Sequence, residues 1–216
     1  ILCPSFVHLG LYQGLPTGIR LGAQHGFPEK SGAFTGEVSF AQLKDMGVEY
    51  VILGHSERRL YFGETDEATR IRLEAALKYL VRPVVCIGET KEERQSGKRD
   101  TLLSKQLEIL FQGLPKMQAE KVVVAYEPRW AIGSGEVPTT EEIQAVGTLI
   151  RQKLTELFDE NTMRRISVVY GGSVKTALLG SVSFEAGMDG VLVGGESLSP
   201  YEMVKMLQVA ESFFTT

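Results

Sequence analysis

The chain has 216 residues, of which 43% are hydrophobic and 23% are charged, and its formal net charge at pH 7 is -4. This length and average composition are those of a globular domain with a buried core and exclude a disordered chain. The acidic balance and the scattered Lys and Arg residues exclude a broad basic surface, so we expect neither nucleic acid nor a membrane as a partner. No apolar run approaches the roughly 18 residues that cross a bilayer and no secretory signal is visible, which favours a cytoplasmic protein. The two cysteines and three histidines lack metal-ligand spacing, so we expect no metal ion.

Short apolar runs rich in Val and Ile predict strands that are covered on both faces. In chain order they are residues 1–3, 19–23, 50–53, 83–87, 121–125, 166–170 and 190–193. Helix start signals lie between them: Ser39 before a short helix that ends before Gly47, Thr65 before residues 66–80, Thr139 before a run to Phe158, and a capping box at Ser199-Pro200-Tyr201-Glu202. Strands that alternate with helices predict an α/β protein with a parallel sheet. No linker divides the chain, so we expect residues 1–216 to form a single domain.

The position of the polar motifs distinguishes an open sheet from a barrel. An open doubly wound sheet would show one dominant Gly-rich loop, and neither GxGxxG nor GxxxxGK[ST] occurs. Instead, polar or Gly-rich groups follow nearly every strand: Gln24, His55, Glu89, Glu127, Gly171-Gly172-Ser173 and Gly194-Gly195. This pattern favours a (β/α)8 TIM barrel, which binds its ligands at the carboxyl ends of many strands. Seven of the eight βα units are then present, and the missing strand would precede Ile1, because seven strands would leave two unpaired edges.

Two motifs carry most of the chemistry. GHSERR (residues 54–59) follows one predicted strand and delivers the imidazole of His55, and YEPRWAIGSG (residues 126–135) follows another and delivers the carboxylate of Glu127. An imidazole and a carboxylate at strand ends are suited to moving a proton next to a carbonyl group. A helix that begins at Ser56 would set its positive end against an imidazolium, so we expect His55 to act as a neutral hydrogen-bond donor.

The motifs together resemble the triosephosphate isomerase family over the whole chain. They are GHSERR, YEPRWAIGSG, YGGS (residues 170–173), DGVLVGGESL (189–198), SGAFTGEVS (31–39) and VVCIGET (84–90), in the family's order and approximate spacing. The resemblance implies a homodimeric TIM barrel that interconverts dihydroxyacetone phosphate and glyceraldehyde 3-phosphate through an enediolate, without a cofactor. It also implies that Glu127 is the catalytic base, that His55 polarises the substrate carbonyl, and that Glu57 either transfers protons or orders its neighbours.

The resemblance assigns further residues by motif. It implies that the phosphate group is held by Gly133, Ser173, Gly194 and Gly195. It implies a closing lid over residues 128–138, with Pro128, Trp130, Ile132 and Gly135 among its anchoring and hinge positions. It also implies a dimer interface at Thr35, Glu37 and Arg58, with an ion pair between Glu37 and Arg58.

The chain also departs from the family. The family opens with a strand that ends in Asn-x-Lys, and that strand, its loop and the first helix have no counterpart here. The lysine is a point charge beside the substrate, and the missing strand would leave unpaired backbone groups on both of its neighbours. We therefore expect the 216 residues alone to be inactive, and aggregated or only partly folded. Smaller departures are Arg129, Glu136, His25 and Glu196. Two alternatives remain: a catalytically dead relative kept as a binding or interaction module, which the presence of both His55 and Glu127 argues against, and another phosphate-binding barrel enzyme.

Overall fold

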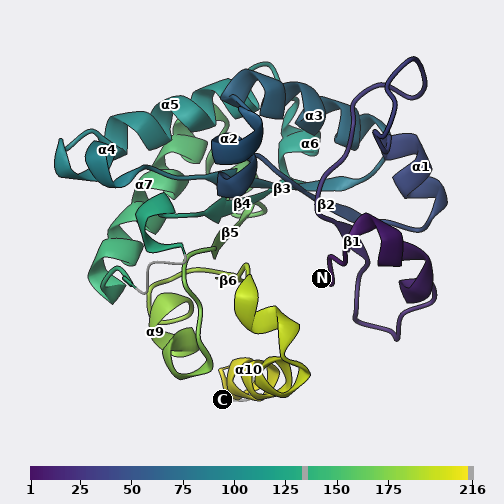
Figure 1. Ribbon diagram of the computed structural model, residues 1–216. Coiled ribbons are helices and arrows are strands. Elements are labelled where there is room, and N and C mark those ends of the chain that lie inside the picture. Colours follow the sequence, from purple (N-terminus) through teal and green to yellow (C-terminus); the bar gives the residue numbers. More distant parts are fainter. Residues whose placement is uncertain (133–135, 214–216) are drawn as a thin grey trace. The chain divides into compact units, whose positions relative to one another are not determined.

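The computed structural model describes residues 1–132 and 136–213 as helices that alternate with short strands (Figure 1). The chain divides into two compact units. The first comprises Ile1–Cys86 and Ile109–Val123, and the second comprises Ile87–Glu108 and Val124–Thr216. The two units are described separately below, and the expectation of a single domain remains a prediction.

The first unit is built on three neighbouring strands, β1 (Gly22–Ala23), β2 (Tyr50–Leu53) and β3 (Arg82–Ile87), of which the last residue of β3 belongs to the second unit. Both pairings are parallel, with Val51 opposite Ala23 on one side and Pro83 on the other. Its helices are η1 (Phe6–Tyr12), α1 (Phe40–Asp45), α2 (Ser56–Phe62), α3 (Asp66–Lys78) and α6 (Lys116–Ala119). Every residue of β3 after Arg82 is buried, as expected for a Val-rich parallel strand covered on both faces.

The expected first strand, residues 1–3, is not a strand in the structure. Only Leu2 pairs, through one isolated parallel bridge to Leu21. Its N–H donates to Arg20 O and its C=O accepts from Gly22 N–H, both at 2.8 Å. The pairing ends there because Pro4 has no N–H to donate, and the chain then enters η1. The described part of the chain therefore holds six strands rather than seven.

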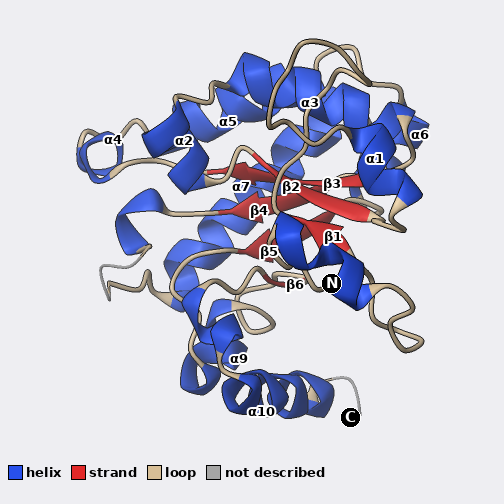
Figure 2. Cartoon of the chain, turned by 45° about the vertical axis from the view of Figure 1, so that its right-hand side comes forward, coloured by secondary structure: helices blue, strands red, loops and turns tan. Residues whose placement is uncertain are grey.

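The second unit contains β4 (Val123–Tyr126, whose first residue belongs to the first unit), β5 (Ser167–Tyr170) and β6 (Gly190–Val191), in that spatial order, with β5 and β6 parallel. Its helices are α4 (Lys91–Gln95), α5 (Arg99–Phe111, whose last turn is in the first unit), η2 (Arg129–Ala131), α7 (Thr140–Leu157), α8 (Glu160–Met163), η3 (Thr176–Leu178), α9 (Leu179–Val182), η4 (Gly195–Leu198) and α10 (Pro200–Ser212). Figure 2 shows the strands in red between these helices. The alternation of parallel strands and helices confirms the α/β class.

The predicted helix starts are confirmed, with one correction. Thr65 and Thr139 cap α3 and α7 through their side chains, and Thr139 forms a full capping box with Glu142. Ser199 caps α10 by accepting from Glu202 N–H, but the predicted reciprocal bond is wrong. The Glu202 carboxylate accepts instead from Thr176 Oγ1 at 2.7 Å, because that hydroxyl is within its reach.

Candidate functional site

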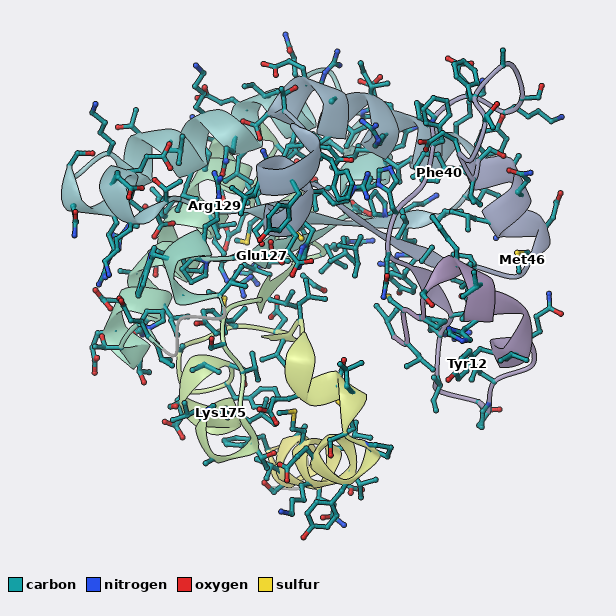
Figure 3. All side chains as sticks on the ribbon, viewed as in Figure 1. Tyr12, Phe40, Met46, Glu127, Arg129 and Lys175 are labelled. Atoms are coloured by element: carbon teal, nitrogen blue, oxygen red, sulfur yellow. The ribbon has the colours of Figure 1, made fainter. Side chains whose placement is uncertain are left out.

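The backbone around Glu127 is fixed by the chain that follows β3. Glu127 N–H donates to Ile87 O at 2.7 Å, and two residues later Arg129 N–H donates to Glu89 O at 3.0 Å. These bonds carry the sheet pairing past the end of β4, so the segment cannot drift as a free loop. Figure 3 shows where Glu127 and Arg129 lie on it. Glu127 is 2% exposed. A buried carboxylate on a rigid strand end is suited to proton transfer, because its position is fixed before a substrate binds.

Two glycines make room for Glu127. A Cβ on Gly88 would lie 1.8 Å from the carbonyl oxygen of Glu127, which no side chain can occupy. A Cβ on Gly171 would lie 2.9 Å from the Glu127 Cγ. Gly88 packs against the backbone of the residue and Gly171 against its side chain, so both are required for its position. Both glycines lie in motifs that resemble the family, but the sequence by itself assigns Gly88 no role; the only signal is a glycine directly after a buried strand.

The buried side chain of Glu89 accepts hydrogen bonds from two residues close to Glu127 in the sequence, Tyr126 and Trp130. Its carboxylate is fully buried, and Oε1 accepts from Tyr126 OH at 3.1 Å and from Trp130 Nε1 at 2.9 Å. Burial, and then the negative charge of Glu89, raise the pKa of Tyr126 and that of Tyr170 well above the ordinary range. Both phenols therefore stay protonated, and Tyr126 acts as a donor. Trp130 is thus held at its indole nitrogen by a charged acceptor, which supports the anchoring role implied by the resemblance.

The residues assigned to phosphate lie on later segments of the same unit. Ser173 Oγ donates to Ala131 O at 2.5 Å and so connects the turn after β5 to η2. Gly194 and Gly195 are exposed, and a Cβ on either would meet no atom within 4 Å. Within the described ranges, neither of their N–H groups donates a backbone hydrogen bond. Gly194 is the N-cap of η4 and Gly195 is its first residue, and the N–H groups at the start of a helix are suited to an anion. Gly133 and Gly135 lie outside the described residues.

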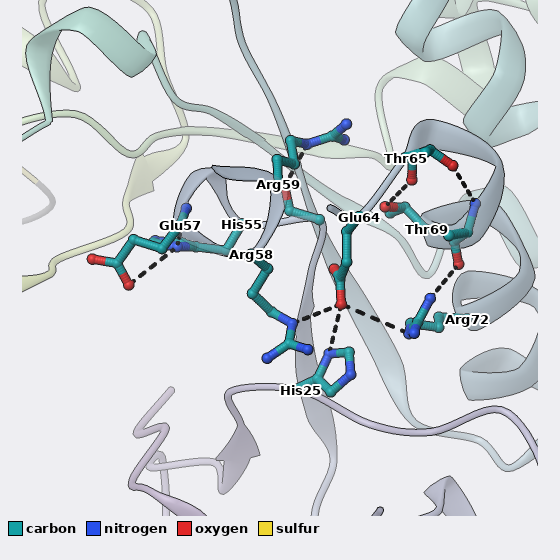
Figure 4. A network of polar contacts seen from close by, with 11 residues as sticks. His25, His55, Glu57, Arg58, Arg59, Glu64, Thr65, Thr69 and Arg72 are labelled. Carbon is teal, nitrogen blue, oxygen red and sulfur yellow. Dashed lines mark hydrogen bonds and ion pairs between the residues drawn. The ribbon is translucent and has the colours of Figure 1, made fainter. Parts of the chain in front are cut away.

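The second candidate catalytic residue, His55, belongs to the first unit. It is the N-cap of α2, and its Nδ1 accepts from Glu57 N–H at 3.3 Å. Nδ1 also lies 3.8 Å from Glu57 Oε2, a side chain that is 66% exposed (Figure 4). The backbone donor is closer and carries a fixed hydrogen, so Nδ1 must present a lone pair to it. The proton of the neutral ring is then on Nε2.

We expect nitrogen NMR of the imidazole to show the Nε2–H tautomer of His55. The Glu57 N–H cannot share a hydrogen bond with a protonated Nδ1, so the cap selects this form. The measurement is a 15N–1H correlation spectrum of the ring at about pH 7.5, assigned by comparison with His55→Gln. A proton on Nδ1 would contradict both the cap and the proposed donor role of the ring.

Arg59 holds the GHSERR segment on the first unit. Its Nε donates to Gly54 O at 2.7 Å, and its Nη2 donates to Cys86 O at 3.1 Å. Nη1 forms an ion pair with Asp66 at 2.6 Å. One guanidinium therefore connects the end of β2, the end of β3 and the start of α3. This side chain fixes where His55 leaves the sheet.

A buried carboxylate, Glu64, gathers three basic groups beside this segment (Figure 4). Its Oε1 lies 2.7 Å from Arg58 Nε, 3.7 Å from His25 Nδ1 and 3.9 Å from Arg72 Nε. Burial lowers the pKa of His25 from 6.5 to about 4; the positive charges of Arg58 and Arg72 also lower it, against the opposing effect of Glu64. The histidine that replaces the family's usual asparagine is therefore neutral in the folded protein.

This histidine makes stability depend on pH. Between pH 6.5 and about 4 the unfolded chain binds a proton at His25 that the folded chain excludes, so stability falls as pH drops through this window. We expect His25 to lower the free energy of unfolding by about 2 kcal/mol between pH 7.5 and pH 5. The measurement is urea unfolding at both pH values, for the unmodified protein and for His25→Asn. Equal pH dependence in the two proteins would contradict the prediction.

The residues assigned to a dimer interface are exposed or engaged within the chain. Thr35 and Glu37 are exposed, whereas Arg58 is paired with Glu64. The described residues contain no ion pair between Glu37 and Arg58. A contact between the two across an interface remains a prediction.

Comparison with known proteins identifies the family. The sequence profile described as Triosephosphate isomerase matches residues 1–210. The chain belongs to the triosephosphate isomerase family. It is 43% identical over 202 residues to a triosephosphate isomerase of Dictyoglomus turgidum, covering 93% of this chain and 81% of the relative. The identity to that of Clostridium botulinum is 44% over 200 residues (92% and 81%), and to that of Alkaliphilus oremlandii 43% over 208 residues (96% and 84%).

Family membership confirms the resemblance from which the site was assigned. The roles of the individual residues remain proposals, and Glu127 and His55 belong to different units. Among the described helices, none is long and apolar enough to cross a membrane. The described residues also contain no group of three or more His, Cys, Asp or Glu side chains that could hold a metal ion.

Proposed function

We propose that this protein interconverts dihydroxyacetone phosphate and glyceraldehyde 3-phosphate by proton transfer through an enediolate. The observation that carries the proposal is the setting of Glu127, a buried carboxylate fixed by its own backbone and fitted against two glycines. Such a group is suited to take a proton from a carbon next to a carbonyl and to return it to the adjacent carbon. The family membership supplies the substrate class.

The roles of the other residues follow from their local chemistry. His55 donates its Nε2–H to the substrate carbonyl oxygen and stabilises the negative charge that develops there. Ser173 and the N–H groups of Gly194 and Gly195 hold the phosphate, together with Gly133. Glu57, exposed beside His55, orders the imidazole or relays protons. Pro128, Trp130, Ile132 and Gly135 serve a lid that shields the enediolate from water. No cofactor is required for these steps.

The proposed architecture is the family's (β/α)8 barrel. In this proposal the six strands and the bridge at Leu2 correspond to seven of its eight strand positions. Parallel pairing within each unit and helices between the strands support this topology.

We also propose a homodimer that uses the first unit. Thr35 and Glu37 are exposed, and so are large apolar side chains close to Thr35 or to Arg58 in the sequence: Phe34 (43%), Leu60 (65%), Tyr61 (72%) and Phe62 (68%). Apolar side chains in such numbers are typical of a surface that another chain covers. Light scattering coupled to size-exclusion chromatography tests this, because a monomer at micromolar concentration would contradict it.

The test of the reaction follows proton transfer directly. The complete protein, rather than the 216 residues alone, is purified and incubated with dihydroxyacetone phosphate in D2O, and glyceraldehyde 3-phosphate is trapped and examined by NMR. We expect turnover with deuterium at C2 of the product, because the abstracted proton exchanges with solvent before it is returned. Binding of the substrate without turnover would favour the alternative of a catalytically dead binding module.

A further inference from the structure

Helix α4 presents two basic side chains, Lys91 and Arg94, to the chain that follows Glu127. The Arg94 guanidinium lies over the ring of Trp130, with its central carbon 4.0 Å from the ring centre. The same guanidinium forms an ion pair through Nη2 with Glu142 in the first turn of α7. Lys91 Nζ lies 2.7 Å from Glu136 Oε1. Two residues one helical turn apart therefore contact this segment at three places.

Arg94 makes two chemically different contacts, one with the ring of Trp130 and one with the carboxylate of Glu142. The face of an indole attracts a guanidinium, and the carboxylate of Glu142 accepts its N–H group. Burial by itself would raise the pKa of Glu142, but the Thr139 backbone N–H and Arg94 outweigh burial, so the pKa is lowered. A lysine ammonium could satisfy either partner but lacks the flat surface that fits both at once.

These contacts complete the fixation of Trp130. Glu89 holds the nitrogen edge of the indole and Arg94 covers its face, so the ring is restrained in two directions. Trp130 is three residues after Glu127, and the intervening Arg129 N–H is bonded to Glu89 O. A shift of the ring would therefore pass along a short and rigid stretch of backbone to the carboxylate.

We propose that Lys91 and Arg94 of α4 are positioning residues, which hold Trp130, Glu136 and Glu142 and thereby set the alignment of Glu127. The proposal rests on the proposed function of Glu127 as the base. It also accounts for one departure from the family: Glu136 is acidic where the family is often basic, and Lys91 provides a matching charge.

The first experiment separates positioning from binding. We expect Arg94→Met to lower kcat about tenfold while KM changes less than threefold, because alignment of the base matters in the transition state. Arg94→Lys keeps the charge without the flat guanidinium and should recover only part of the loss. The matched control is Lys105→Met, an exposed lysine on α5 with no described partner. Unchanged kcat in Arg94→Met, or an equal loss in the control, would overturn the proposal.

The chain's single tryptophan provides a second readout that is independent of turnover. Because Trp130 is that residue, the emission of the protein reports its surroundings directly. We expect Arg94→Met to shift the emission to longer wavelength and to increase quenching by acrylamide, with cooperative thermal unfolding retained. Emission and quenching identical to those of the unmodified protein would show that Arg94 does not restrain the ring.

A charge exchange tests Lys91. We expect Glu136→Lys alone to lower kcat about threefold, and Lys91→Glu with Glu136→Lys to restore most of it, as a coupled pair requires. Additive losses in the double variant would contradict the pair.

If the proposed function itself were wrong, the unmodified protein would show no turnover. If only the positioning role were wrong, the unmodified protein would turn over normally and the α4 variants would match it in kcat, emission and quenching.

Discussion

Replacing Glu127 by aspartate should lower kcat for triose phosphate interconversion roughly 100-fold, with a much smaller change in KM. The carboxylate would withdraw by one methylene from the carbon whose proton it takes. The backbone cannot move forward to compensate, because Glu127 N–H is bonded to Ile87 O and the carbonyl packs on Gly88. Steady-state kinetics in both directions, with a coupled dehydrogenase assay, measure the effect.

The matched control is Glu57→Asp, which shortens an exposed carboxylate beside His55 by the same methylene. We expect a smaller loss there, because the Glu57 backbone N–H that caps His55 is unchanged. Near-normal turnover in Glu127→Asp would remove this residue from the role of base. A larger loss in Glu57→Asp than in Glu127→Asp would assign the decisive proton transfer to the exposed carboxylate.

Replacing Gly88 by alanine should abolish most activity and lower the free energy of unfolding by about 2 kcal/mol or more. The new Cβ would lie 1.8 Å from the Glu127 carbonyl oxygen, so one backbone must move. Gly88 itself cannot withdraw easily, because its N–H donates to the buried Gln106 Oε1 at 3.0 Å. The strain is therefore transferred to the segment that holds the base, and kcat should fall at least 100-fold.

Gly190→Ala serves as the control, since a Cβ there would meet only Val169 Cγ1 at an ordinary 3.6 Å. Urea unfolding and kinetics are measured on both variants. A stable and active Gly88→Ala protein would show that the two segments can separate without cost, and it would contradict the close packing around Glu127.

The sequence was sufficient where local rules decide the outcome. Val-rich runs of four to six residues gave β2 and β3, and Thr65 and Thr139 marked two helix starts, because strand burial and capping depend on neighbouring residues. The candidates His55 and Glu127 could be proposed for a similar reason, since their motifs are contiguous in the chain. The failures were also local: residues 1–3 looked apolar enough for a strand, and Glu202 looked placed for a reciprocal cap.

Only the tertiary structure showed how these residues are supported, because the supporting partners come from distant segments. Gly88 is 39 positions from Glu127 in the sequence, yet the two backbones lie so close together that only a glycine fits at position 88. Glu89 receives the protons of Tyr126 and Trp130, and Arg94 joins Trp130 to Glu142, contacts that no periodicity encodes. The sequence by itself determined the family and the candidate groups for the chemistry, and the packing of distant segments decided how firmly each candidate is held, since close packing depends on atoms that meet only in the folded chain.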